Sequence, residues 1–147
     1  MTILLVHTHS AHLEILNHAL RRQSMRTEQA HTCKEADLLL AGPEPPELVF
    51  TDTELPDGTW ADIVEIAERA AIPVNVIVVS RLVDIRTYIE ALQSGAFDFI
   101  APPFEDLALT HVVNCAAGNV ATRRNTQAQA LKHGDFSSRS FQLPAAS

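Results

Sequence analysis

Three histidines follow a short apolar run near the start of the chain, in the sequence LLVHTHSAH (residues 4–12). His7 and His9 would lie on the same side of an extended strand, and neutral imidazole is a good zinc ligand. A zinc site needs further ligands from other loops, and the sequence offers too few in suitable settings. We therefore predict no metal site here, and we expect His12 and His18, within the first helix, to face solvent.

Other polar or special residues also stand directly after apolar runs. Asp52 closes LVFTD (48–52), and Ser80-Arg81 follows VNVIVV (74–79). Pro102 follows FDFIA (97–101). If these runs are parallel strands, their carboxyl ends meet at one edge of the sheet, where ligands bind in such folds. The candidate chemistry of the chain is therefore expected at this edge.

The elements that must position these residues alternate along the chain. Apolar or extended runs at 3–6, 25–30, 48–52, 74–79 and 97–101 are typical of strands. Between and after them, apolar residues recur at helical spacing in five segments, the last of which lies around residues 109–120. Strict alternation predicts an α/β fold, a five-stranded parallel sheet with helices on both faces.

Composition limits the class of protein. The 147 residues suit a single domain, and the net charge of −7 at pH 7 argues against nucleic acid as a partner. No apolar segment is long enough to span a membrane and no signal peptide is visible, so a cytoplasmic location is expected. Cys33 and Cys115 form no metal-binding motif, and both are expected to be buried as small apolar side chains.

The signals of regular structure weaken after about residue 121. We predict a folded domain over residues 1–121, followed over residues 122–147 by an extension of the last helix and a flexible C-terminal tail. The helical pattern is expected to end at His133-Gly134.

In this order and spacing, the runs resemble the response-regulator receiver domains of two-component signalling. The resemblance covers residues 1–121 and is carried by ILLV at the first strand, ELVFTDTELPDG at the third, VIVVS at the fourth and SGAFDFIAPPF through the fifth. It implies a flavodoxin-like sheet in the strand order 2-1-3-4-5. It also implies the family's chemistry, which is transfer of a phosphoryl group to an aspartate with the help of Mg²⁺.

The resemblance gives several residues a role. Asp52 matches the phosphoacceptor position, Ser80 matches the hydroxyl residue that contacts the phosphoryl group, and Phe99 matches the aromatic residue that moves with it. Pro103-Phe104 matches the end of the family's Lys-Pro-Phe motif. The family holds the peptide bond before this proline in the cis form, so the Pro102–Pro103 bond is expected to be cis.

Two departures from the family pattern affect the site. His7-Thr8 stands where the family has the two acidic residues that hold Mg²⁺, and Pro102 stands where it has a lysine. Mg²⁺ prefers hard oxygen ligands, and phosphoryl transfer depends on charge neutralisation by metal and cations. These replacements predict a site that binds no metal and does not transfer a phosphoryl group.

Arg81 is a third departure, because the family usually has a small residue after the hydroxyl position. An arginine here could fold over the pocket and pair with Asp52, which would hold the site shut. The alternative is that Arg81 points from its loop into solvent, as most loop arginines do.

These observations predict a pseudo-receiver: a receiver-like domain that signals by binding proteins, needs no cofactor and is not an enzyme. One alternative is an active receiver that uses Asp52 with Mg²⁺. A second is a small flavodoxin-like ligand-binding module, although the chain has no GxGxxG phosphate loop. The expected partners are a histidine kinase or an output protein, together with a second copy of the chain bound through residues 83–120.

Overall fold

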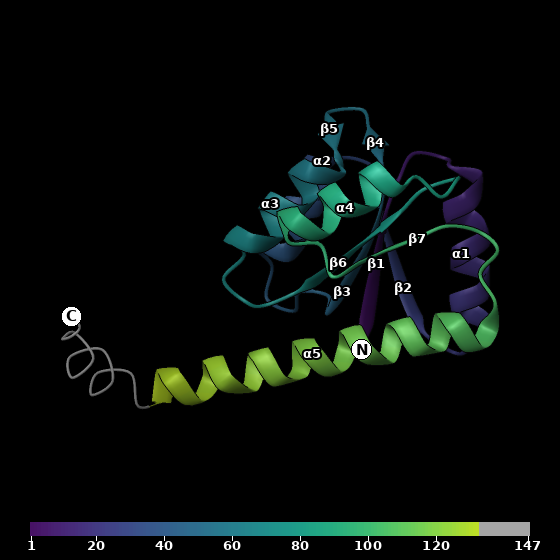
Figure 1. Cartoon of the computed structure of the whole chain (residues 1–147). Coiled ribbons are helices and arrows are strands. Elements are labelled where there is room, and N and C mark those ends of the chain that lie inside the picture. The colour runs from purple at the N-terminus through teal and green to yellow at the C-terminus, as the bar shows by residue number, and fades with distance from the viewer. Residues whose placement is uncertain (133–147) are drawn as a thin grey trace.

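The computed structural model describes residues 1–132. Within them, one parallel sheet contains β1 (Thr2–Val6), β2 (Arg26–Ala30), β3 (Leu48–Asp52), β6 (Asn75–Val79) and β7 (Asp98–Ile100). The strands lie in the order β2-β1-β3-β6-β7, and all neighbours are parallel (Figure 1). Counted along the sequence this order is 2-1-3-4-5, which confirms the predicted topology.

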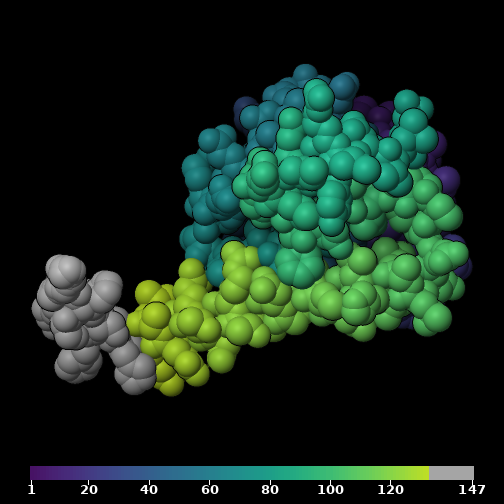
Figure 2. Space-filling view, in the orientation of Figure 1, coloured from purple at the N-terminus to yellow at the C-terminus, as the bar shows by residue number. Residues whose placement is uncertain are grey.

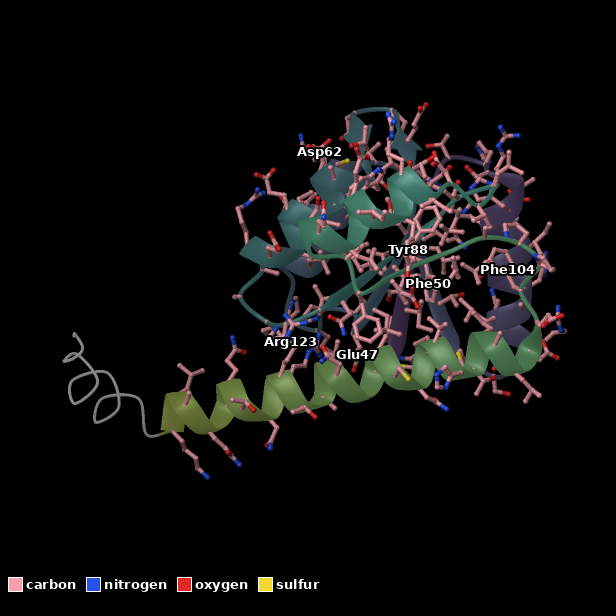
Figure 3. All side chains as sticks on the ribbon, viewed as in Figure 1. Glu47, Phe50, Asp62, Tyr88, Phe104 and Arg123 are labelled. Carbon is pink, nitrogen blue, oxygen red and sulfur yellow. The ribbon has the colours of Figure 1, made fainter. Side chains whose placement is uncertain are left out.

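Helices cover both faces of the sheet. They are α1 (Ala11–Arg22), α2 (Cys33–Leu40), α3 (Trp60–Arg69), α4 (Ile85–Ser94) and α5 (Asp106–Lys132). On one face, apolar residues of α1 and α5 pack over Phe50 of β3 and its neighbours (Figure 3). On the other face, α2, α3 and α4 form a second apolar cluster.

The central strands are apolar except at their polar ends, because both of their faces are covered. All five residues of β3 are buried, and so are all five of β6. This burial fixes the register of each strand and places Asp52, the last residue of β3, at the carboxyl edge of the sheet.

A small hairpin follows β3. It pairs β4 (Glu54–Leu55) with β5 (Gly58–Thr59) in antiparallel fashion. The Asp57 carboxylate accepts hydrogen bonds from the backbone N–H groups of Cys33 and Lys34, at 2.8 and 3.1 Å. These bonds, chiefly the one from Cys33, lower the pKa of Asp57 and tie the hairpin to the start of α2.

The last helix is longer than the sheet that it covers. α5 continues to Lys132, and Figure 2 shows it as a rod that extends past the body of the molecule. Arg124 donates to the carbonyl oxygens of Pro73 and Pro46, at 2.8 and 3.0 Å, and so ties the extension to two loops. The helix shows no break at residue 121, and the predicted boundary there stays a prediction; His133-Gly134 and the tail lie outside the described residues.

The structure also tests the predictions made from the sequence for one peptide bond, the two cysteines and membrane-spanning helices. The Pro102–Pro103 peptide bond is cis, as predicted. Cys33 is buried, which raises the pKa of its thiol to about 11, but Cys115 is exposed and the prediction for it was wrong. Cys115 misses the apolar face of α5, where Val113 and Ala116 are buried. Among the helices of residues 1–132, none is both long and apolar enough to cross a membrane.

Candidate functional site

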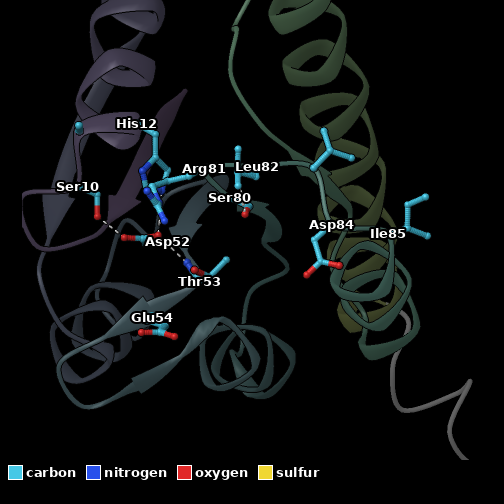
Figure 4. Close-up of a pocket in the computed structure, with 12 residues that line it drawn as sticks. Ser10, His12, Asp52, Thr53, Glu54, Ser80, Arg81, Leu82, Asp84 and Ile85 are labelled. Carbon is cyan, nitrogen blue, oxygen red and sulfur yellow. Dashed lines mark hydrogen bonds and ion pairs between the residues drawn. The ribbon is translucent and has the colours of Figure 1, made fainter.

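A cavity of about 790 Å³ opens at the carboxyl edge of the sheet (Figure 4). Three segments line it: residues 10–12 at the start of α1, residues 52–54 after β3, and residues 80–85 between β6 and α4. Loops at this edge of a parallel sheet are the usual place for a ligand site. The cavity is therefore the candidate site of the chain.

Asp52 lies on the floor of this cavity and is 9% exposed. Its Oδ1 accepts hydrogen bonds from Nε2 of His12, at 3.0 Å, and from the backbone N–H of Thr53, at 2.8 Å. Its Oδ2 accepts a hydrogen bond from the Ser10 hydroxyl. Both carboxylate oxygens are thus occupied by groups of the protein itself, as the dashed lines in Figure 4 show.

The start of α1 supplies these groups. Ser10 is the N-cap residue of α1, but its side chain makes no cap hydrogen bond and turns to Asp52 instead. His12 is the second residue of the helix and is buried. The positive end of the helix dipole also points at this edge, and it favours a nearby negative charge. The protein therefore balances the charge of Asp52 with a helix end, a hydroxyl and an imidazole.

The prediction that His12 faces solvent was wrong, whereas His18 is exposed as expected. His12 stands four residues before Leu16 and eight before Leu20, both of which are fully buried. This spacing places His12 on the buried side of α1. The spacing was the available signal, and a histidine on that stripe needs a polar partner, which Asp52 provides.

His7 and Thr8 turn away from Asp52, toward β2. His7 is buried; its Nδ1 accepts from the backbone N–H of Ser10, at 3.1 Å, so the ring proton lies on Nε2, 2.9 Å from Oε1 of Gln29. The Thr8 hydroxyl donates to the carbonyl oxygen of His31. Burial lowers the pKa of His7. Neither residue is part of the cavity lining.

Of the other predicted positions, two line the cavity and two lie outside its lining. Ser80 and Arg81 line the cavity with Asp52. Arg81 is exposed, and within residues 1–132 it forms no ion pair with Asp52, whose oxygens Ser10, His12 and Thr53 already hold. Phe99 is buried and packs edge-on against Tyr88, with ring centroids 5.9 Å apart. Phe99 and Pro102 both lie outside the cavity lining.

Residues 3–114 match the family model described as the response regulator receiver domain. The chain belongs to this family. It is 37% identical over 92 residues to the response regulator protein PilR of Pseudomonas aeruginosa. The aligned residues are 63% of this chain and 20% of PilR. It is 33% identical over 103 residues to the KDP operon transcriptional regulatory protein KdpE of Escherichia coli. The aligned residues are 69% of this chain and 44% of KdpE.

Solved receiver domains share the fold of this one. A signal receiver domain from Vibrio parahaemolyticus superposes with a TM-score of 0.70 at 22% identity, over 82% of this chain and 92% of that one. A CheY-like receiver domain from Methanospirillum hungatei JF-1 gives 0.68 at 21% identity, over 82% and 96%. The receiver domain spans less than half the length of PilR and KdpE.

The site of this receiver domain does not fit the family's Mg²⁺. Mg²⁺ needs several hard oxygen ligands, but the buried carboxylate here, Asp52, already accepts three hydrogen bonds. The other side chains at Asp52 are the Ser10 hydroxyl and the His12 imidazole, and imidazole is a poor ligand for this ion. In residues 1–132, no group of three or more His, Cys, Asp or Glu side chains is arranged to hold a metal ion.

Proposed function

We propose that this receiver domain is a pseudo-receiver, which acts in two-component signalling by binding proteins and is not phosphorylated on Asp52. The observation that carries the proposal is the set of three hydrogen bonds on the Asp52 carboxylate. A carboxylate that accepts a phosphoryl group needs an oxygen free to approach the phosphorus in line with the leaving group. Both oxygens of Asp52 are engaged and nearly buried.

The charges around Asp52 support the same proposal. Phosphoryl transfer brings negative charge that metal ions and cations must neutralise. Pro102 supplies no cation where the family has its lysine, and His7 and Thr8 bond toward β2. The groups that bond to Asp52 are a hydroxyl, an imidazole and a backbone N–H, and none of them is an acidic side chain that could hold a metal with it.

The alternative is an active receiver, and the presence of Ser80 and Asp52 in one cavity favours it. We would incubate the full chain with acetyl phosphate and Mg²⁺ and measure its intact mass. We expect no added phosphoryl group. In a parallel titration with Mg²⁺ and beryllofluoride, we expect no saturable change in the amide resonances of Asp52, Glu54 and Ser80. A mass increase or saturable shifts at low millimolar Mg²⁺ would contradict the proposal.

A positive control follows from the structure. Restoring the acids and the lysine (His7→Asp, Thr8→Asp and Pro102→Lys) supplies the missing ligands and charge. Because Ser10 and His12 still hold Asp52, we expect phosphorylation only when Ser10→Ala and His12→Ala are added. Recovery by the triple variant alone would show that these hydrogen bonds do not protect Asp52.

We also propose signalling proteins as partners, a histidine kinase or an output protein, and a homodimer through residues 83–120. Exposed apolar side chains on α4 and α5 support the dimer: Ile89 is 46% exposed and Leu107 is 87% exposed. We expect sedimentation at micromolar concentration to show a dimer that Leu107→Ser weakens. Leu131→Ser, at a similarly exposed leucine outside this surface, should leave it unchanged. A monomer at these concentrations would contradict the dimer.

A further inference from the structure

The Asp52 cavity has an apolar rim. Leu82, Val83 and Ile85 line the cavity on the α4 side, and they are 71%, 78% and 69% exposed. Against the rest of residues 1–132, α4 buries only Ala91. Three large aliphatic side chains in water beside one cavity favour a partner that covers them, because removal of apolar surface from water is favourable.

The same cavity is acidic. The carboxylates of Asp52, Glu54 and Asp84 line it, against the single guanidinium of Arg81 and the imidazole of His12. The hydrogen bond from the Thr87 hydroxyl lowers the pKa of Asp84, which keeps that carboxylate charged. Glu54 is exposed, and among residues 1–132 its carboxylate forms no hydrogen bond or ion pair. The cavity can therefore receive a cation, and Glu54 is the group placed to pair with it.

We propose that this cavity binds a segment of a partner protein in which one basic side chain is flanked by aliphatic side chains. The basic side chain enters the cavity and pairs with Glu54, while the flanking residues cover Leu82 and Val83. The inference rests on the proposed function, since a metal ion and a phosphoryl group would need the same space. It names the chemistry by which a receiver site without phosphorylation recognises a partner.

The exposure of the rim decides between a protein segment and a small molecule. Leu82 and Val83 are more than two-thirds exposed, so a small cation inside the cavity would leave most of their surface in water. A polypeptide reaches across the rim and covers both. The proposed dimer is supported by Ile89 and Leu107 of the surface over residues 83–120, which lie outside the cavity lining. A second copy is a poor occupant of the cavity itself, because it would bring its own net charge of −7 to an acidic site.

The test uses three synthetic peptides and the full chain, without metal. Each peptide has 12 residues with leucines at helical spacing around one central position, which is arginine, its neutral analogue citrulline, or glutamate. We expect the arginine peptide to shift the amide resonances of residues 10–12, 52–54 and 80–85 saturably. We expect it to bind roughly tenfold more tightly than the citrulline peptide, and the glutamate peptide to bind least.

Variants separate the charge from the apolar rim. Glu54→Gln should remove most of the preference for arginine over citrulline. Leu82→Ser with Val83→Ser should weaken the arginine and citrulline peptides alike. The matched control is Ile15→Ser with Leu38→Ser, at aliphatic residues that are 55% and 67% exposed on other helices, and it should change nothing.

Three results would overturn the inference. Equal binding of the three peptides, or no saturable shift in residues 80–85, would show that the cavity does not select a basic segment. Shifts of residues 10–12 and 52–54 that depend on protein concentration without any peptide would show that a second copy enters the cavity. The beryllofluoride titration decides the proposed function separately: failure of the peptides with no metal binding removes this inference alone.

Discussion

At the scale of single residues, the Asp52 carboxylate is stabilised by hydrogen bonds from His12 and Ser10. These bonds take the place of the contacts that a metal ion would make with the carboxylate. Nε2 of His12 lies 3.0 Å from Oδ1 of Asp52, and both side chains are nearly buried. In such a pair, loss of one partner leaves the other without its hydrogen bond in a place that water reaches poorly. The pair therefore contributes to folding as well as to the character of the site.

A double-mutant cycle measures this dependence. We expect His12→Ala to lower the free energy of unfolding by about 1–3 kcal/mol, because it removes a hydrogen bond to a nearly buried carboxylate. Combined with Asp52→Ala, the loss should be smaller than the sum of the two single losses. Urea denaturation of the four proteins gives the coupling. His18→Ala, at an exposed position of the same helix, should change stability by less than about 0.5 kcal/mol. Strict additivity of His12 and Asp52 would contradict the contact.

His7 gives the stability a dependence on pH. Burial lowers its pKa below 6.5, and protonation of Nδ1 would also remove the hydrogen bond from the Ser10 N–H. The unfolded chain therefore takes up the proton first, so this contribution is complete above pH 6.5 and is lost as the pH falls through the lowered pKa of the folded state. We expect His7→Gln to flatten the fall in unfolding free energy between about pH 7 and 5, measured by urea denaturation. His18→Gln should not flatten it, and an unchanged slope in His7→Gln would assign the acid sensitivity elsewhere.

The sequence predicted some of these residues and missed others for physical reasons. Asp52 and Ser80 could be placed because they end buried strands, and strand ends of a parallel sheet share one edge. His12 was missed because a polar residue on a helix is assigned to solvent unless its spacing to Leu16 and Leu20 is considered. The direction of the His7 side chain depends on Gln29, a contact between strands that no local pattern contains.

At the scale of the elements, the buried strands were the easiest to predict. β3 and β6 are uninterrupted apolar runs apart from their polar ends, and their observed bounds differ from the predicted ones by at most one residue. The β4–β5 hairpin was not predicted, because each of its strands has two residues and two residues show no periodicity. The hairpin is formed instead by pairing across the turn, together with the hydrogen bonds that Asp57 accepts from the start of α2.

A glycine at the end of one helix and a glycine inside another should respond in opposite ways to alanine. Gly95 ends α4 with a φ of 113°, a left-handed conformation that disfavours a side chain, and an added Cβ would collide with the Glu68 carboxylate. Gly118 lies inside α5, with nothing within 4 Å of an added Cβ. We expect Gly95→Ala to cost about 1–2 kcal/mol and Gly118→Ala to gain about 0.5–1 kcal/mol, measured by denaturation. A loss at Gly118 would mean that another surface packs against this part of α5.

At the scale of the whole molecule, the cavity lies at one edge of the sheet, and the anchor of α5 lies at the other. Asn75, the first residue of β6, donates to the carbonyl oxygen of Ala116 and to Oδ1 of Asn119, and accepts from Arg123 at 2.6 Å (Figure 3 labels Arg123). Arg124 adds bonds to the loops that hold Pro46 and Pro73. α5 is thus fixed beyond the last apolar contact that it makes with the sheet, at Val120.

Removal of this anchor should loosen the second half of α5. We expect Asn75→Ala to leave Asn119 and Arg123 without their partner and to lower stability by about 1–3 kcal/mol. Amide hydrogen exchange should become faster over residues 117–128, with little change in β1 and β3. Asn114→Ala, at an exposed position of α5, is the matched control and should leave the exchange unchanged. Uniformly faster exchange across the sheet would show that Asn75 supports the whole core.

The anchor also fixes the direction in which anything joined to the end of α5 would point. Each residue turns an α-helix by about 100° and advances it by about 1.5 Å. Because Arg123 and Arg124 hold the helix against the body, its phase at Lys132 is set relative to the Asp52 cavity. A helical reporter fused directly after Lys132 would therefore face a direction that the number of intervening residues selects. One inserted alanine would turn it by about 100°, whereas seven would return it to within about 20° of its first orientation, some 10 Å farther out.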